Sequence, residues 1–286
     1  CLTWFLFFCY SQYPMSEINE SLTKQAKLLR QDIIQMISNA ASGHPGGSLS
    51  AIDIITALYF KVLRHRPTEP DWANRDRFVL SKGHAAPALY AALARSGYFP
   101  VEQLASLRKL GSPLQGHPEK GRLAGVEASS GSLGQGISIG SCMALAARLD
   151  QKDYRTYVLM GDGESNEGQI WESALFAAHY KIDSLTVILD RNRQQLDDWT
   201  EKILDTESLS EKWRAFRWHV IEIDGHNMDQ ILKAFEEAKN TAGKPTLILA
   251  NTTKGKGVSF MENNLEFHGV APNAEQTKTA LLELCA

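Results

Sequence analysis

The sequence is poor in the features that mark several common classes of protein. Only four of its 286 residues are cysteines, Cys1, Cys9, Cys142 and Cys285, and they show no paired spacing. Neither a disulfide framework nor a zinc site is therefore expected, and a reducing cytoplasm fits this composition. An excess of one charge is also missing, because 30 Lys and Arg residues oppose 33 Asp and Glu residues and leave a net charge of −3. This balance argues against a nucleic-acid or membrane partner.

The most apolar stretch, at the start of the chain, is too short to cross a membrane. It covers the first ten residues and lacks the basic start and the small-residue cleavage site of a signal peptide. We expect residues 1–14 to be a non-native or disordered leader, with a membrane anchor as the alternative. Internal repeats and proline-rich linkers are missing too, so we expect residues 15–286 to form one large domain.

The rest of the chain alternates between two kinds of apolar pattern. Short aliphatic runs near residues 78, 157, 185, 219 and 246 predict strands, and those without polar interruption predict strands covered on both faces. Spacings of three and four predict helices between them. The expected fold is α/β, a doubly wound and mainly parallel sheet with helices on both faces. Segment 199–212 is polar and is expected to cross the surface. The expected helices cover residues 16–39, 52–62, 137–149, 167–180 and 228–239, with a further alanine-rich helix after residue 84.

The segment from Gly161 to Asn192 is the most informative part of the sequence. Asp162 lies between two glycines at the end of one predicted strand, and Asn192 follows the next strand. A right-handed βαβ unit places both strand ends at one edge of the sheet, so these side chains can meet. With a nearby carbonyl, which we assign to Gln194, they are hard ligands suited to Mg²⁺, with Ca²⁺ or Mn²⁺ as alternatives. The alternative is that Gly-Asp-Gly is an ordinary turn.

Four histidines lie in loops that contain glycine. They are His44, His84, His117 and His268. Histidine donates hydrogen bonds and carries protons near neutral pH, and glycines let the backbone approach a ligand. Each loop taken alone has a simpler explanation, since glycine-rich turns with a histidine are common and His84 can cap the helix that follows it.

Two other segments suit an anion. Residues 131–136 read Gly-Ser-Leu-Gly-Gln-Gly and open a helix of small residues, so their amides attract an anion, although close packing of the helix explains the glycines equally well. Lys254 and Lys256 lie on a flexible glycine loop, where they meet phosphate or are simply solvated.

Taken together and in this order, the motifs resemble the amino-terminal, diphosphate-binding part of transketolase, a thiamine-diphosphate enzyme. The resemblance runs from about Lys24 to His268, and so many ordered motifs make coincidence implausible. The segments that carry it are 42–46, 75–84, 116–118, 131–136, 161–192, 224–226, 254–255 and 268–269.

The resemblance implies a role for particular residues. The implied ligands of the divalent metal are Asp162, Asn192 and the Gln194 carbonyl. The implied contacts to thiamine diphosphate are Gly163, Asn192, His84, Lys254, His268 and the backbone of Gly131, Ser132 and Leu133. The implied catalytic residues, which face the sugar and move protons, are His44, His117 and His268. Lys82 is expected to assist at the diphosphate, and Glu167 corresponds to the glutamate that links the two cofactor sites of a family dimer.

A full transketolase is about twice as long as this chain, and the pyrimidine-binding half, with the glutamate that activates the cofactor, is not found in it. We therefore expect the amino-terminal subunit of a two-subunit transketolase, which transfers a two-carbon ketol unit between sugar phosphates. A separate carboxy-terminal chain would complete it, in an α2β2 assembly in the cytoplasm.

Three other functions stay open on the sequence alone. The α subunit of a 2-oxoacid dehydrogenase shares the metal segment and the split, but is not expected to carry all four histidines. Deoxyxylulose-phosphate synthase normally keeps its later domains in the same chain. A non-catalytic diphosphate-binding module is opposed by the retained ligands and histidines.

Overall fold

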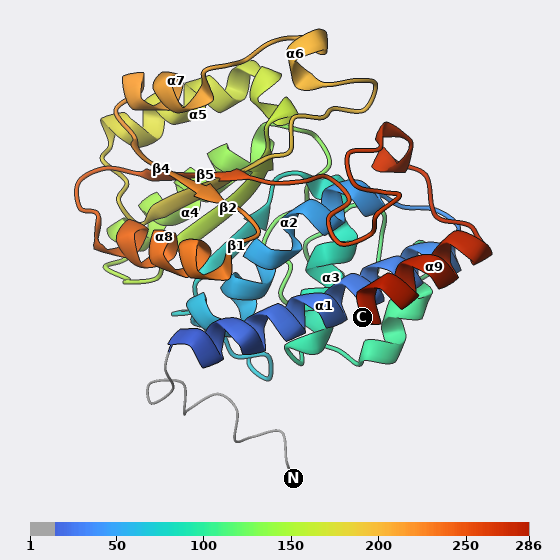
Figure 1. Cartoon of the computed structure of the whole chain (residues 1–286). Helices are drawn as coiled ribbons and strands as arrows, with labels where there is room; N and C mark the ends of the chain where they lie inside the picture. Colours follow the sequence, from blue (N-terminus) through green and yellow to red (C-terminus); the bar gives the residue numbers. More distant parts are fainter. Residues whose placement is uncertain (1–14, 286) are drawn as a thin grey trace.

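The computed structural model describes residues 15–285, which form a parallel sheet between two layers of helices (Figure 1). The sheet has five strands in the order β1-β2-β3-β5-β4, and every neighbouring pair is parallel. All five predicted strands are confirmed, whereas the leader lies outside the described residues. The strands are β1 (Arg77–Leu80), β2 (Thr156–Gly161), β3 (Leu185–Arg191), β4 (His219–Asp224) and β5 (Thr246–Asn251).

The central strands are buried on both faces, which explains their uninterrupted aliphatic sequences. Alternate residues of β2 enter different cores: Tyr157 and Leu159 pack into one, and Val158 and Met160 into the other. Each core is completed by helices on its own side of the sheet. The apolar runs therefore hold two helical layers together through one sheet.

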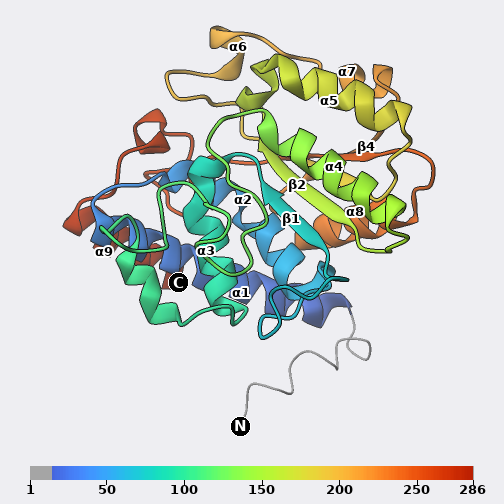
Figure 2. The ribbon, with the colours of Figure 1, turned by 180° about the vertical axis from the view of Figure 1, so that it is seen from behind.

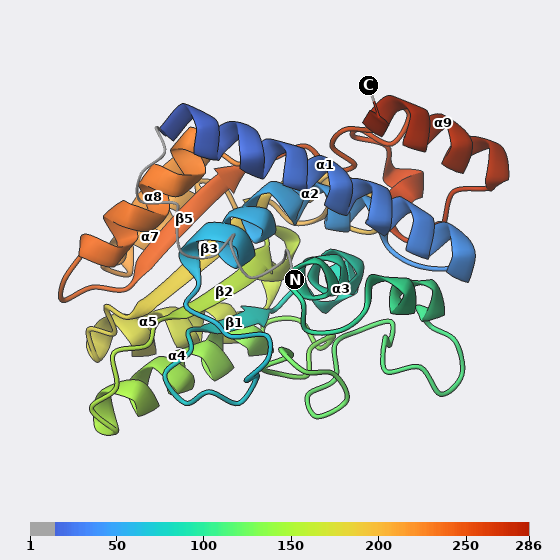
Figure 3. The same cartoon turned by 90° about the horizontal axis from the view of Figure 1, so that it is seen from below.

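Helices cover both faces, as the predicted fold requires. On one face lie α1 (Met15–Ala40), α2 (Pro45–Ala57), α3 (Ala86–Arg95) and α8 (Met228–Asn240), as Figure 3 shows from below. On the other lie α4 (Gln135–Leu149), α5 (Gly168–His179) and α7 (Leu209–Ala215), seen from behind in Figure 2. None of the helices in residues 15–285 is long and apolar enough to cross a bilayer.

The chain reverses its direction across the sheet after β4. From β3 it passes through α6 (Thr200–Ile203) and α7 to the edge strand β4, and α8 then returns it to β5, which lies between β3 and β4. A right-handed crossover in the opposite direction places its helix on the opposite face, which is where α8 lies. The doubly wound prediction is confirmed.

Three local features differ from the sequence predictions. The helix expected from residue 52 begins earlier, at Pro45. The sequence does not indicate this start, because α2 is buried on all sides and shows no amphipathic pattern there. Segment 199–212 does not simply cross the surface, since Leu209 begins α7 and is buried. The chain also ends in α9 (Ala274–Cys285), which was not predicted and packs along α1, where Gln31 donates to the carbonyl of Leu284.

Candidate functional site

The carboxyl ends of four strands bring predicted site residues to one edge of the sheet. His84 follows β1, Asp162 follows β2, Asn192 follows β3 and Lys254 follows β5. Ligands of open α/β sheets bind beyond this edge. The parallel topology thus gathers groups that are far apart in the sequence.

Asp162, Asn192 and Gln194 form a connected set of oxygen donors. The Asp162 carboxylate accepts hydrogen bonds from the backbone N–H groups of Gly163, at 2.8 Å, and of Arg193. The side-chain oxygen of Asn192 accepts from the backbone N–H of Gln194 at 3.1 Å. The loop after β3 is therefore folded against the end of β2, as the βαβ geometry predicts.

This donor set fits a hard divalent cation. Asp162 is only 3% exposed, and no ion pair to it is found within residues 15–285. Burial, and next the nearby Asp190 carboxylate, raise the pKa of Asp162 to about 6. A bound cation would favour the ionised form and offset both effects. No cluster of three or more His, Cys, Asp or Glu side chains that could hold a metal exists in this part of the chain, so such a site would depend on amide and backbone oxygens.

Two buried lysines lie beside the oxygen donors. Lys82 Nζ lies 2.5 Å from a carboxylate oxygen of Asp190. Lys254 Nζ donates to the carbonyl of Gln195 at 3.0 Å and lies 2.7 Å from His268 Nδ1. Burial, and next the charge of Lys82, lower the pKa of Lys254 to about 8. Because Lys82 is paired with Asp190, Lys254 is the one of the two lysines that remains available to a polyanion such as a diphosphate.

The rings of three of the four predicted histidines lie close together. The ring centroid of His44 lies 5.5 Å from that of His84 and 5.7 Å from that of His268, and the His84 and His268 centroids are 5.5 Å apart. His117 is exposed at the rim, with its ring centroid 6.4 Å from that of His44. All four residues therefore reach the same edge of the sheet.

Burial keeps this histidine cluster neutral. The pKa of His44 is lowered to about 4, first by burial and next by the charge of Arg108. The pKa of His268 is lowered to about 3, first by burial and next by the charge of Lys254. The pKa of His84 also lies well below its usual range, mainly through burial. A neutral imidazole has one donor and one acceptor nitrogen, which suits proton transfer.

Segment 131–133 reaches the site through its backbone. A Cβ on Gly83 would lie 2.7 Å from the backbone nitrogen of Gly131, and a Cβ on Gly131, whose φ is +137°, would lie 3.1 Å from the His117 ring. Only glycine permits this approach at both positions. Ser132 and Leu133 are exposed beside it.

The family is decided by comparison with known proteins. The sequence matches the family described as transketolase, thiamine diphosphate binding domain, over residues 18–284. The chain belongs to the transketolase family. The predicted family is therefore confirmed.

Two similar transketolase subunits align with this chain almost from end to end. The 6-deoxy-6-sulfo-D-fructose transketolase subunit SqwG of Clostridium sp. (strain MSTE9) is 47% identical over 270 residues, which are 94% of this chain and 98% of that protein. An apulose-4-phosphate transketolase subunit of Phocaeicola vulgatus is 43% identical over 265 residues, which are 93% of this chain and 94% of that protein.

Longer transketolases match over part of their length. The crystal structure of transketolase from Campylobacter jejuni superposes with a TM-score of 0.88 at 36% identity, covering 93% of this chain and 43% of that chain. Human transketolase is 41% identical over 257 residues, which are 90% of this chain and 41% of that protein. The chain thus spans about two fifths of these transketolases.

Two acidic residues connect the loops of this transketolase-family site in ways that the sequence did not reveal. The Glu164 carboxylate accepts from the hydroxyl of Ser81 and from the backbone N–H of Gly134, at 2.8 Å, and so joins the loop after β1 to the start of α4. Asp190 accepts from Lys82 and Ser50. Their positions beside strand ends were visible, but their partners lie far away in the sequence. Glu167, in contrast, is exposed.

A buried ionic network supports the loop that carries Lys254. Asp53 of α2 accepts from both terminal nitrogens of Arg30 of α1, at 3.0 and 2.6 Å, and from His226 Nδ1 at 2.8 Å. The other ring nitrogen, Nε2, accepts from the backbone N–H of Thr253 at 2.8 Å. The Arg30 Nε also donates to the carbonyl of Lys256. The lysine loop is therefore held by helices of one face of the sheet.

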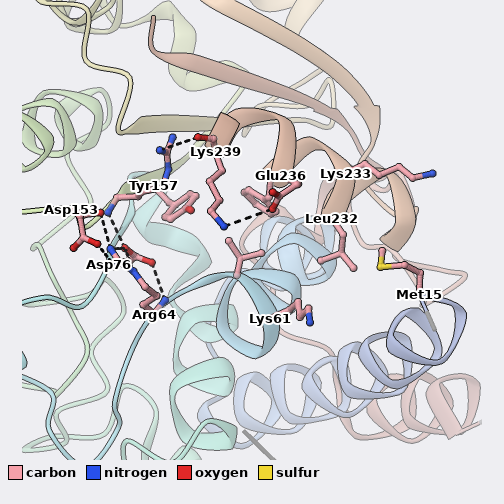
Figure 4. A pocket seen from close by; sticks show the side chains of 13 residues that line it. Met15, Lys61, Arg64, Asp76, Asp153, Tyr157, Leu232, Lys233, Glu236 and Lys239 are labelled. Carbon is pink, nitrogen blue, oxygen red and sulfur yellow. Dashed lines mark hydrogen bonds and ion pairs between the residues drawn. The ribbon is translucent and has the colours of Figure 1, made fainter. Parts of the chain in front are cut away.

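A cavity lies at the opposite end of the sheet. Its volume is about 730 Å³, and its lining, drawn in Figure 4, includes Arg64, Asp76 and Asp153 near the amino ends of β1 and β2. None of the predicted site residues lines it. This cavity is therefore separate from the predicted site of this member of the transketolase family.

Proposed function

We propose that this chain is the amino-terminal subunit of a two-subunit transketolase that transfers a two-carbon ketol unit between sugar phosphates. The observation that carries the proposal is the alignment, over nearly their whole length, with relatives named as transketolase subunits. The family match also favours this function over the α subunit of a 2-oxoacid dehydrogenase. The four histidines at the sheet edge favour it over a non-catalytic module.

The proposed cofactors are thiamine diphosphate and Mg²⁺. Asp162, Asn192 and the Gln194 carbonyl would hold the metal, and Lys254 with the backbone of segment 131–133 would hold the cofactor. The cofactor supplies an electron sink for the carbanion formed from a ketose. His44, His117 and His268 would orient the sugar and exchange protons with its hydroxyl groups.

The proposed partner is a carboxy-terminal transketolase subunit on a separate chain. It would supply the pyrimidine-binding half of the site, in an α2β2 assembly in the cytoplasm. The support for a separate partner is that the aligned relatives named as subunits are about as long as this chain, whereas the transketolases matched over part of their length are more than twice as long.

Reconstitution tests this function. Mixing the chain with the carboxy-terminal subunit from the same source, thiamine diphosphate and Mg²⁺ should produce ketol transfer from a ketose phosphate to an aldose phosphate, measured by product formation. Neither chain should be active by itself, nor should a mixture from which the cofactor is omitted. Ketol transfer by this chain alone would contradict the split enzyme, and a folded complex that binds the cofactor but acts on no ketose would contradict a transketolase.

A further inference from the structure

Arg108 connects the loops that carry two of the site histidines. It follows η4 (Val101–Ser106) and precedes His117 in the same irregular segment. Its Nη1 donates to the hydroxyl of Ser42 at 2.9 Å, and its Nη2 lies 3.4 Å from His44 Nδ1. The sequence alone indicates no role for this arginine, because Ser42 and His44 are remote from it along the chain.

The position of the guanidinium is closely defined. The backbone of Arg108 is left-handed, with φ at +58°, and its N–H donates to the carbonyl of Leu114 at 2.8 Å. A Cβ on Gly116 would lie 2.9 Å from the guanidinium carbon, so this glycine leaves the space in which the group lies. A left-handed backbone is uncommon for a residue other than glycine, and it persists where the surroundings fix it.

The Nε atom of Arg108 is buried and has no hydrogen-bond partner within residues 15–285. An unpaired buried donor costs free energy, of the order of 1–3 kcal/mol. The guanidinium group of Arg108 therefore lies where not all of its own donors form hydrogen bonds. What the arginine gains there is contact with Ser42 and His44.

This contact determines which nitrogen of His44 carries the proton. Arginine has donors and no acceptor, so His44 Nδ1 must accept and the hydrogen must be on Nε2. The Nε2 side of the ring faces the loop after η6 (Leu265–His268), because a Cβ on Gly269 would lie 3.6 Å from Nε2. Gly269 directly follows His268, whose ring centroid is 5.7 Å from that of His44. The N–H group of His44 thus lies on the side of the loop that follows His268.

We propose that Arg108 is the positioning residue of the histidine cluster, which holds His44 as a neutral donor with its hydrogen on Nε2. The inference rests on the proposed function only for its catalytic consequence, since the tautomer is a property of this chain. Burial lowers the pKa of His44 first and the charge of Arg108 second, ahead of His117 and Lys254. The same arginine is the second cause, after burial, that lowers the pKa of His117. One cation therefore acts on two histidines.

The tautomer can be measured on the full chain without a partner. Long-range ¹H–¹⁵N correlation of ring-labelled histidines distinguishes the two neutral forms, and loss of signals in His44→Asn assigns the residue. The wild type should show a protonated Nε2 and an unprotonated Nδ1. In Arg108→Gln the preference should be lost, and the titration of His44 should move up by about one pH unit because a nearby positive charge is removed.

Two further variants keep the test decisive. Arg122→Gln removes an exposed arginine of the same segment, which pairs only with Glu119 among the described residues, and should leave the His44 signals unchanged. If Arg108→Gln does not fold, Ser42→Ala removes the acceptor of Nη1 and should shift the His44 signals in the same direction by a smaller amount. A folded Arg108→Gln or Ser42→Ala chain with His44 signals identical to the wild type would overturn the proposal.

The reconstituted enzyme separates positioning from a general structural effect. Arg108→Gln should lower kcat about tenfold or more with a smaller change in KM, and should move the acidic limb of the kcat profile to higher pH. A variant with an unshifted profile would overturn the proposal. Failure of the wild-type complex to transfer ketol units would instead contradict the proposed function, and the tautomer measurement would still decide the role of Arg108.

Discussion

At the amino ends of β1 and β2 charged groups are paired with one another. At the carboxyl ends the ion pair of Lys82 and Asp190 lies beside Asp162 and Lys254, for which no ion pair is found within residues 15–285. Near the amino ends Arg64 donates to Asp76 and to Asp153, at 3.1 and 2.8 Å (Figure 4). Near the carboxyl ends burial, and next the charge of Asp190, raise the pKa of Asp162, while burial, and next the charge of Lys82, lower the pKa of Lys254. The two ends of the sheet therefore differ in how completely their charges are paired.

The difference separates structural support from function. Paired charges are satisfied by the fold, while a buried like-charge arrangement costs free energy until a ligand offsets it. A divalent cation would offset the charge of Asp162, and a diphosphate would offset that of Lys254. The cavity of about 730 Å³ at the amino ends is lined by none of the predicted site residues, so electrostatics is a better guide to the site here than that cavity.

The largest expected effect is at the carboxyl end. Asp162→Ala should weaken Mg²⁺-dependent binding of thiamine diphosphate to the reconstituted complex by about 100-fold or more, because the only carboxylate among the proposed ligands is lost. Titration calorimetry measures it. Asp153→Ala, which removes an exposed acid at the amino end, should leave the affinity unchanged. Equal affinities for the two variants would remove Asp162 from the metal site.

A variant at the amino end should lose stability but keep its affinity for the cofactor. Arg64→Met leaves Asp76, whose side chain is 3% exposed, without its main cation, and should lower the free energy of unfolding by about 2–3 kcal/mol without affecting cofactor binding. Urea denaturation measures the loss. Arg66→Met, at an exposed ion pair, should cost less than about 0.5 kcal/mol. A weaker affinity of Arg64→Met for thiamine diphosphate would contradict the assignment of structural support to the amino end and of function to the carboxyl end.

The smallest expected effect is the pH dependence of stability. The pKa of His44 is lowered from 6.5 to about 4, so between these values the unfolded chain binds more protons than the folded chain. Stability should therefore be fully present above about pH 6.5 and should fall as the pH decreases toward about 4. His44→Gln should reduce this loss by about 1 kcal/mol, after allowance for the partial exposure of the ring.

The measurement is urea denaturation at both ends of that pH range. His179→Gln, which replaces an exposed histidine of α5, is the matched control and should retain the wild-type pH dependence. If His44→Gln retains it as well, then His44 is not a source of acid instability.

Much of the fold could be predicted because its signals are local. The aliphatic runs of β2 and β3 indicate strands buried on both faces, and parallel pairing then requires their carboxyl ends to meet. The start of α2 could not be located, because a helix buried on all sides has no polar face to define its limits. The helix α9 was missed because only three of its residues, Thr277, Ala280 and Leu284, are buried.

The site could be predicted only as a set of residue types. The histidines and Asp162 were found because glycines mark their loops. The partners of Asp190 and the contact of Arg108 with His44 were not found, because they depend on tertiary approach between remote segments. The assignment of metal, cofactor and sugar contacts to individual residues stays a prediction.

The network of Arg30, Asp53 and His226 determines which helices a shortened but functional chain must keep. The helix that supplies Arg30 contributes no group to the sheet edge, yet its side chain fixes the backbone at Lys256 and, through Asp53 and His226, at Thr253. Trimming the chain to its strands and their crossover helices would keep every loop in sequence but would remove the contacts of Arg30 that support the backbone on the C-terminal side of Lys254. The minimal unit that keeps a defined lysine therefore includes the first helix, which a definition by strands alone would discard.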